Sequence, residues 1–554
     1  MATSRLKEAF LHLSQHSVDS VQNGKTFTEW DEYMHVDRPI ESELYEKMDE
    51  IDVAGGGIVL LVGSAGDGKS HLLSRIRQMS DWGDNSFYND ATASCSPQKT
   101  AIDTLKEALS DFKDTNLYKT NSKIVLAINL GKLNALIDDD EFKADYSEIV
   151  NSTAPIFDND DTTPPIDTNR VKVVMFVNHQ AFEFHADATD KLVESQFMSA
   201  IMEKVVSTDM KNPFYKAYQE DITNGVSSKN PLILNYQMLS IPEVRKSIVM
   251  TIIETIVRFK ILITPREFLD FLYSIMVYPH DYKEKKDFYE ALIPSLLYCG
   301  KENLIQKAIN KLDPLKRSST DHDKQLSVLF TSYSIPANYF DASQIALLPS
   351  ELIKRINEFY ANNGRDIERT TKFVFRLKHL LNYHTESNVY ASYLEILKGI
   401  YNKDFQKMQD IYNIVSKAIP RHSGSYYGKA NMVPLNIQGG RYRLFGKMQL
   451  KPEPIKPYYS ETEHNKFLLR FDMEWKILDS YVTLRMDYQL YSYLYELNRG
   501  KLALSYENDK NLTFGRFIRQ LVEKCNCEQE ITVITADRQE MILSESSFGN
   551  IELL

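Results

Sequence analysis

The segment Gly63-Ser-Ala-Gly-Asp-Gly-Lys-Ser70, called the GK loop below, carries the most specific chemical pattern in the chain. It matches G-x-x-x-x-G-K-[ST], in which glycines let several backbone N–H groups point inward at a phosphate. Lys69 would then reach the β- and γ-phosphates, and the Ser70 hydroxyl would hold Mg²⁺. The pattern predicts ATP and Mg²⁺ as cofactors. The predicted nucleotide contacts are Gly63, Ser64, Ala65, Gly66, Asp67, Gly68, Lys69, Ser70 and His71.

The flanks of the GK loop support this interpretation. An apolar run, Ile58–Val62, enters the loop as a strand, and His71–Met79 has the pattern of a helix that leaves it. The positive end of that helix dipole would face the same phosphate. The alternative is a chance glycine-rich turn between a strand and a helix.

Hydrolysis needs a second group, usually an acid at the end of another strand that helps hold Mg²⁺ and polarises water. In an AAA+-like strand order the third strand, Ile124–Leu130, should supply it, but Asn129 stands there. Asn129 could orient water without bringing charge to the metal. Asp90, which closes the weak run Ser86–Asp90, is the substitute metal ligand, and Asp138–Asp140 offers a further alternative.

Two more residues are candidates by position. Asn178 ends the apolar run Val171–Val177, where AAA+ proteins place a polar side chain near the γ-phosphate, although a turn-forming asparagine explains it as well. Arg266 stands at the start of a helix with Thr264 as N-cap and Pro265 in the first turn. It resembles a lid arginine that swings onto the phosphates, and a surface arginine is the alternative.

Short apolar runs alternate with helical patterns from about Gly57 to Tyr236, which predicts a parallel sheet covered by helices on both faces. The fold class is therefore an α/β P-loop NTPase, AAA+-like, with a helical lid and middle region and a C-terminal α+β domain. The predicted segments are an N-terminal helical segment (1–50), the NTPase core (51–240) with an acidic surface insertion near 138–167, the helical lid and middle region (241–415), and the C-terminal α+β domain (416–554). Within this scheme Leu232–Asn235 is the last strand of the core, and Tyr481–Leu497 is a strong helix of the C-terminal domain.

Composition bounds the function. The chain has 554 residues, 43% hydrophobic and 25% charged, with a formal net charge of −11, so it is a globular protein that is not basic overall. No secretory signal and no apolar run of membrane-spanning length is visible, which predicts a cytoplasmic protein without membrane contact. Four cysteines in a chain of this length do not form a disulfide framework. Cys525 and Cys527 are interpreted as reduced cysteines, with a zinc site as the alternative.

One local region is basic. Between Ser416 and Pro457 eight Lys or Arg residues stand against one acid, Glu453, with His422 and three tyrosines interleaved. This basic–aromatic stretch suits phosphate contact with base stacking, an acidic protein partner, or a solvated linker. Contact with DNA, directly or through partners, is therefore an expectation that rests on this stretch.

Beyond the loop, the N-terminal half resembles the DptF family. The resemblance rests on Arg38-Pro-Ile-Glu-Ser-Glu-Leu leading into the GK loop, on Phe87-Tyr-Asn-Asp-Ala-Thr-Ala-Ser, on Ile128-Asn-Leu-Gly and on the total length. DptF is the P-loop component of the restriction system that attacks DNA lacking phosphorothioate modification. The resemblance implies an ATP-binding and ATP-hydrolysing subunit in bacterial antiviral defence, with two partner subunits, one of them a DNA translocase-like NTPase. It carries over only Gly63, Gly68, Lys69 and Ser70.

Two other functions stay open. The chain could be a nucleotide-binding switch or scaffold with little turnover, which Asn129 favours, or it could itself cut DNA, although no nuclease-type cluster stands out. The sequence leaves open whether a homo-oligomer forms. Arg245, Arg258 and Arg369 are unranked candidates for an arginine acting on a neighbouring subunit.

Overall fold

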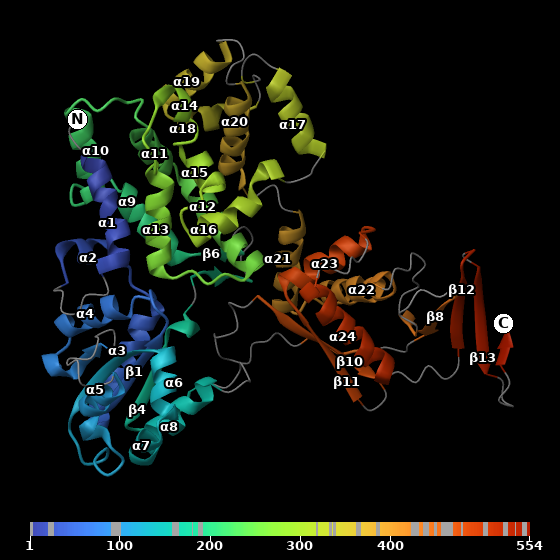
Figure 1. Cartoon of the computed structure of the whole chain (residues 1–554), viewed down its shortest axis with the longest axis horizontal. Helices are drawn as coiled ribbons and strands as arrows, with labels where there is room; N and C mark the ends of the chain where they lie inside the picture. The colour runs from blue at the N-terminus through green and yellow to red at the C-terminus, as the bar shows by residue number, and fades with distance from the viewer. Residues whose placement is uncertain are drawn as a thin grey trace. The chain divides into compact units, whose positions relative to one another are not determined.

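A four-stranded parallel sheet with helices around it lies in the N-terminal half of the chain (Figure 1). Its order is β2-β3-β1-β4, so the strand that enters the GK loop is flanked by β3 and β4. Every residue of β1 is buried, as expected for an apolar strand covered on both faces. The sheet with its surrounding helices confirms the predicted α/β class. The strands are β1 (Gly57–Gly63), β2 (Phe87–Asn89), β3 (Lys123–Asn129) and β4 (Val171–Met175).

Alternate residues of these strands build two separate cores, one on each face of the sheet. Leu60 and Leu126 point into one core, and their neighbours Leu61 and Val125 point into the other, because side chains alternate along a strand. Two helices, α3 (Pro39–Ala54) and α4 (Lys69–Met79), pack on the second face. The first face is covered by α5 (Ala101–Ala108), α6 (Leu130–Asp138), α7 (Asp140–Asp145) and α8 (Ser147–Thr153).

The structure is a computed structural model that describes most of the chain, in two compact units. The described residues are 4–19, 27–89, 101–157, 165–179, 181–186, 192–316, 320–331, 335, 339–361, 367–383, 388–422, 432–435, 442–447, 451–455, 469–477, 480–501, 508–524, 530–537, 539–545 and 551–553. The first unit comprises Met1–Phe182, Ser195–Thr255 and Ile261–Tyr383, and the second comprises Glu183–Glu194, Ile256–Lys260 and His384–Leu554. The predicted boundary at residue 415 falls inside a helix, α22 (Phe405–His422). Among the described helices, none is both long enough and apolar enough to cross a bilayer.

The segment near 138–167, predicted as an acidic surface insertion, forms helices rather than a loop over most of the part that the structure describes, although Asp138, Asp140 and Glu141 are exposed. Asp139 accepts a hydrogen bond from the Phe142 backbone N–H and so caps α7. Phe142, Tyr146 and Ile149 are buried in the core on the first face of the sheet. The acidic run is therefore a helix junction, since aspartate is a favoured N-cap. Residues 158–164 lie outside the described residues.

The predicted strand Leu232–Asn235 is a helix. Asn230 caps it with a side-chain bond to the Leu232 N–H, and Pro231 occupies its first turn. A run of three apolar residues cannot by itself distinguish a strand from a buried helix. Asn235 is fully buried and donates to the carbonyls of Met276 and Ala291, so it ties three segments of the first unit together.

The rest of the first unit is helical (Figure 1). Its first helix, α1, packs against both α10 and α13, which brings the start of the chain beside the middle region. These helices are α1 (Arg5–Asp19), α2 (Glu29–Met34), α9 (Gln196–Val206), α10 (Pro213–Thr223), α11 (Pro231–Leu239), α12 (Pro242–Phe259), α13 (Pro265–Met276), α14 (Glu284–Asp287), α15 (Ile293–Cys299), α16 (Leu304–Ile309), α17 (Thr320–Thr331), α18 (Ala342–Leu347), α19 (Ser350–Ala361) and α20 (Ile367–Leu381).

The second unit combines helices with antiparallel sheets of order β11-β10-β9 and β14-β13-β12-β8-β7. Within it Trp475 is buried against the ring of Phe517. The predicted helix Tyr481–Leu497 is only partly correct, because its first residues form β11, paired with β10, before α23 begins. The elements are β5 (Glu183–Phe184), β6 (Val193–Glu194), α21 (Asn388–Tyr401), α22 (Phe405–His422), β7 (Met432–Pro434), β8 (Tyr442–Lys447), β9 (Lys451–Pro452), β10 (Phe471–Ile477), β11 (Ser480–Met486), α23 (Tyr488–Asn498), α24 (Asn508–Lys524), β12 (Glu530–Thr535), β13 (Glu540–Glu545) and β14 (Ile551–Leu553).

Candidate functional site

The GK loop joins the end of β1 to the first residue of α4. Gly68 has a left-handed backbone (φ 95°) and directly precedes α4, which begins at Lys69. The Lys69 ammonium donates to the Ser64 carbonyl at 2.5 Å, across the loop. The Asp67 carboxylate accepts the Ser64 backbone N–H at 2.5 Å, and burial raises the pKa of that carboxyl while this hydrogen bond and Lys69 oppose the rise. The loop is thus a closed turn with its cation folded over it.

Glycine is required at two positions of this turn. Gly66 has φ 89°, and a Cβ there would lie 2.9 Å from the Thr264 hydroxyl oxygen. Gly68 has φ 95°, and a Cβ would lie 3.0 Å from the Arg38 guanidinium. The loop is therefore in close contact with two segments far away in the sequence, the connection before α3 and the start of α13.

We expect Gly66→Ala to destabilise the protein more than Gly55→Ala does. Both glycines have positive φ, 89° and 79°, so both substitutions carry the left-handed strain of about 1–2 kcal/mol. Only at Gly66 does the new methyl group also meet a neighbour, the Thr264 hydroxyl, which is fixed because it caps α13. Urea unfolding of the two variants measures the difference, and equal losses of stability would contradict the close contact.

Arg38 is a second cation at the loop. Its guanidinium donates to the Asp67 carbonyl at 3.1 Å and lies over the rings of Phe176 and Phe197, at 5.3 and 5.8 Å from their centroids. Burial lowers the pKa of Arg38 from its usual value, with Glu41 and Asp67 opposing the shift. An arginine held this way fixes the backbone of the loop and keeps a positive charge beside it.

The Ser70 hydroxyl has a side-chain partner from another strand. The amide of Asn89, the last residue of β2, lies 2.9 Å from the Ser70 Oγ. The end of β2 thus reaches the residue that the sequence assigns to Mg²⁺. Asp90, the predicted substitute acid, follows directly but lies outside the described residues.

Asn129 is placed at the end of β3, beside the end of β1, with which it pairs in register at Gly63. Its side-chain oxygen accepts the Gly131 backbone N–H at 2.9 Å and so caps α6. Asn129 therefore has a structural role as a helix cap, and it also borders the cavity described below.

The two remaining candidates are placed differently. Thr264 and Glu267 form a capping box at the start of α13, with Pro265 in the first turn, which confirms the predicted cap. Arg266 follows, and its Cβ lies 3.5 Å from the position of a Gly66 Cβ. Asn178 ends a short 3₁₀ turn that follows β4. The strand β4 ends at Met175 and is therefore shorter than the predicted run Val171–Val177. In the described part of the chain, the cavity lining includes Arg266 but not Asn178.

A cavity of about 390 Å³, called the loop cavity below, opens beside the GK loop within the first unit. Four cationic side chains line it, and among the described residues Asp31 is the one carboxylate in its lining. This concentration of positive charge stands out because the chain as a whole carries −11. The cations are Arg38, Lys69, Lys132 and Arg266.

The loop cavity also has an apolar lining. These side chains come from α1, α2, α9 and α13, so the N-terminal helices and the helical region close the cavity opposite the sheet. An indole and a phenyl ring among them offer flat surfaces for stacking. The large apolar residues from these helices are Leu13, Trp30, Met34, Phe197, Ile201 and Leu269.

Sequence reasoning identified the GK loop and Arg266 but missed other residues of the site. Arg38 entered only as part of a resemblance, and Asn89 and Lys132 were not singled out. Arg38 precedes the loop by a whole helix, and its contact with Asp67 is visible only after folding.

The basic-residue pattern of the stretch 416–457 likewise did not show that Arg421 donates to Asn498 or that His422 bonds Tyr493. Cys525 and Cys527 lie outside the described residues.

Comparison with protein-family models, curated proteins and solved structures gives no match to this chain.

Proposed function

We propose that the chain binds a nucleoside triphosphate with Mg²⁺ in the loop cavity and hydrolyses it. The observation that carries the proposal is the composition of the cavity lining, which joins the glycine-rich turn and four cations to an apolar, aromatic surface. A triphosphate matches the first part, because backbone N–H groups at a helix start and nearby cations bind phosphate. A nucleobase matches the second part by stacking and apolar contact.

The residues present suit Mg²⁺ as a companion of the triphosphate. Mg²⁺ keeps several waters and takes oxygen ligands from substrate phosphates and from one or two side chains. The Ser70 hydroxyl would be such a ligand, and Asn89, 2.9 Å away, would orient it. When bound, Mg²⁺ would neutralise part of the negative charge of the phosphates. Lys69, Arg38 and Arg266 would bind and orient the phosphates from their own positions.

We also propose that the chain is an AAA+-like P-loop NTPase. Such a protein would use α13 as its lid element, and Arg266, at the start of that helix, would reach the phosphates. The resemblance to the DptF family extends the proposal to a subunit of a restriction complex against DNA lacking phosphorothioate modification, with a translocase-like partner. Mass measurement of the chain with ATP and Mg²⁺, alone and with co-expressed neighbours, tests that assembly.

A second function, a nucleotide-dependent switch with little turnover, is favoured by Asn129. Its side chain caps α6, and a neutral amide brings no charge to a metal. Nucleotide binding would then fix the position of α13 relative to the GK loop, within the first unit, without rapid hydrolysis.

Phosphate release by the purified full chain separates these functions. We expect MgATP-dependent release that Lys69→Ala abolishes, measured with and without DNA and partner subunits. Tight MgATP binding without Lys69-dependent release under any of these conditions would instead establish the switch. If the chain shows neither MgATP binding nor phosphate release, the proposal as a whole is refuted.

A further inference from the structure

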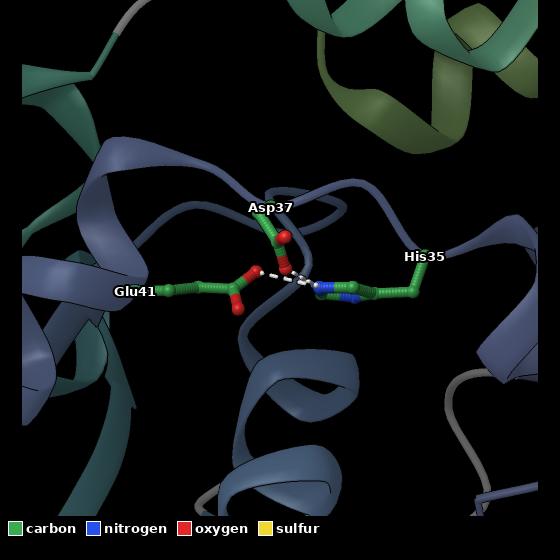
Figure 2. A group of neighbouring side chains, drawn as sticks. All are labelled: His35, Asp37 and Glu41. Carbon is green, nitrogen blue, oxygen red and sulfur yellow. Dashed lines mark hydrogen bonds and ion pairs between the residues drawn. The ribbon is translucent and has the colours of Figure 1, made fainter.

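Three potential metal ligands meet between α2 and the first turn of α3, beside the loop cavity (Figure 2). One ring nitrogen of His35, Nε2, lies 3.1 Å from Asp37 Oδ1 and 3.1 Å from Glu41 Oε1. Figure 2 shows the two carboxylates converging on the same nitrogen from different backbone segments. The possible ligand atoms of the three residues all lie within 4.8 Å of one another.

The hydrogen bonds of this group do not satisfy its oxygen atoms. His35 Nε2 is within hydrogen-bond distance of Asp37, but it can carry only one proton. Glu41 Oε1 lies in ion-pair distance of His35 Nε2 but accepts no hydrogen bond, and the Glu41 residue is only 6% exposed. A buried carboxylate oxygen that lacks a donor is costly unless a cation faces it. Glu41 therefore points into a place that suits a positive ion.

The outer neighbours of His35 also match those of a metal-ligating imidazole. Its other ring nitrogen, Nδ1, lies 3.0 Å from His71 Nε2, and the two rings stack at 5.3 Å between centroids. A histidine that binds metal through one nitrogen usually donates its other N–H to a fixed acceptor, which sets the tautomer. Arg75 lies 3.2 Å from Asp37 Oδ1, the same oxygen that faces His35. It lies 4.0 Å from Glu41 Oε2, so the other oxygen of Glu41, Oε1, faces His35 alone.

We propose that His35, Asp37 and Glu41 bind one divalent transition-metal ion of the Zn²⁺ type, with its coordination completed by water. One imidazole and two carboxylates are ligands that Zn²⁺ and similar ions accept, and three protein ligands leave an open position. The ion would replace the proton on His35 Nε2 and would bind Glu41 Oε1, which accepts no hydrogen bond. This site is distinct from the Mg²⁺ position at Ser70, because none of its three ligands belongs to the GK loop.

The site would connect to the loop cavity through His71. This residue directly follows Ser70 at the start of α4, and both His35 and His71 line the cavity. Metal on Nε2 leaves the His35 proton on Nδ1, so His71 Nε2 must accept it. The metal would therefore fix the orientation of one side chain in the lining of the cavity. The proposal stands whether or not the cavity binds a nucleotide.

Zinc binding by the full chain, freed of metal with a chelator that is then removed, tests the site without nucleotide. We expect the unsubstituted protein to bind one more equivalent of Zn²⁺ than Asp37→Ala or Glu41→Gln at equilibrium. Asp37 has a side chain 86% exposed, so its substitution leaves the core intact and decides the matter if Glu41→Gln does not fold. The matched control is Glu46→Gln, at an exposed position of α3, the helix that carries Glu41. This variant should bind as much Zn²⁺ as the unsubstituted chain.

Cobalt provides an independent spectroscopic readout. Co²⁺ in this site should give visible bands without the sulfur charge-transfer absorption of a cysteine site, and Asp37→Ala should remove those bands. Lys69→Ala should leave both zinc binding and the cobalt bands unchanged, which separates this site from the nucleotide site. Equal zinc binding by Asp37→Ala and the unsubstituted chain would overturn the proposal.

Discussion

Lys69→Ala is expected to weaken MgATP binding by about 2–5 kcal/mol, which is about 30-fold to several thousand-fold. The ammonium of Lys69 lies over the GK loop, where it donates to the Ser64 carbonyl. Because phosphate oxygens would take over that donor in the complex, its removal leaves triphosphate charge without a partner inside the cavity. A fluorescent ATP analogue titrated into the full chain measures the loss.

The matched control is Lys113→Ala. Lys113 forms an ion pair with Asp145 and precedes β3, so it belongs to the opposite end of the sheet from the GK loop. Its removal should leave the affinity for MgATP unchanged, because it takes a charge from the surface without touching the cavity. Equal losses for the two variants would indicate a long-range effect of net charge, and unchanged binding by Lys69→Ala would contradict the assigned role.

Arg38→Met is expected to weaken MgATP binding about tenfold to a hundredfold. Arg38 lines the loop cavity, so its loss removes a positive charge that would form a charge-assisted hydrogen bond with a phosphate oxygen. Such bonds contribute about 1.5–3 kcal/mol each. Methionine keeps the apolar packing against Phe176 and Phe197 but loses the hydrogen bond to the Asp67 carbonyl, so stability is measured beside affinity.

Arg170→Met is the control for this prediction. Its guanidinium also donates to backbone carbonyls, those of Gly56 and Thr120, but at the end of the sheet where β1 and β4 begin. Thermal unfolding of both variants checks that the fold is retained, and binding titrations give the affinities. If Arg38→Met bound MgATP as tightly as Arg170→Met does, Arg38 would only support the fold.

The sequence was sufficient where the signal is local. The GK loop carries its own flanks, an apolar strand and a helix pattern, so β1 and α4 could be predicted together with the turn between them. Thr264 and Pro265 gave the start of α13 in the same way, because N-cap and first-turn preferences act within one turn of helix. Lys69 and Arg266 could therefore be placed on the correct elements.

The remainder depended on contacts that no short window contains. Leu232–Asn235 became a helix because Asn230 and Pro231 start one, whereas the apolar run alone suits either structure. The strand β2 has three residues, too few to show a period, so the contact of Asn89 with Ser70 was not visible. The meeting of His35 with Glu41 depends on how the chain turns between α2 and α3, which composition does not indicate.

Isothermal titration of the intact chain with MgATP tests the central claim most directly. The structure predicts one binding site, with heat that disappears in Lys69→Ala and persists in Lys113→Ala. Titrations at two temperatures, repeated with GTP, CTP and UTP, ensure that a binding enthalpy near zero at one temperature is not taken for absence of binding. If the folded chain releases or absorbs no heat with any of these nucleotides at either temperature, the loop cavity is not a nucleotide site.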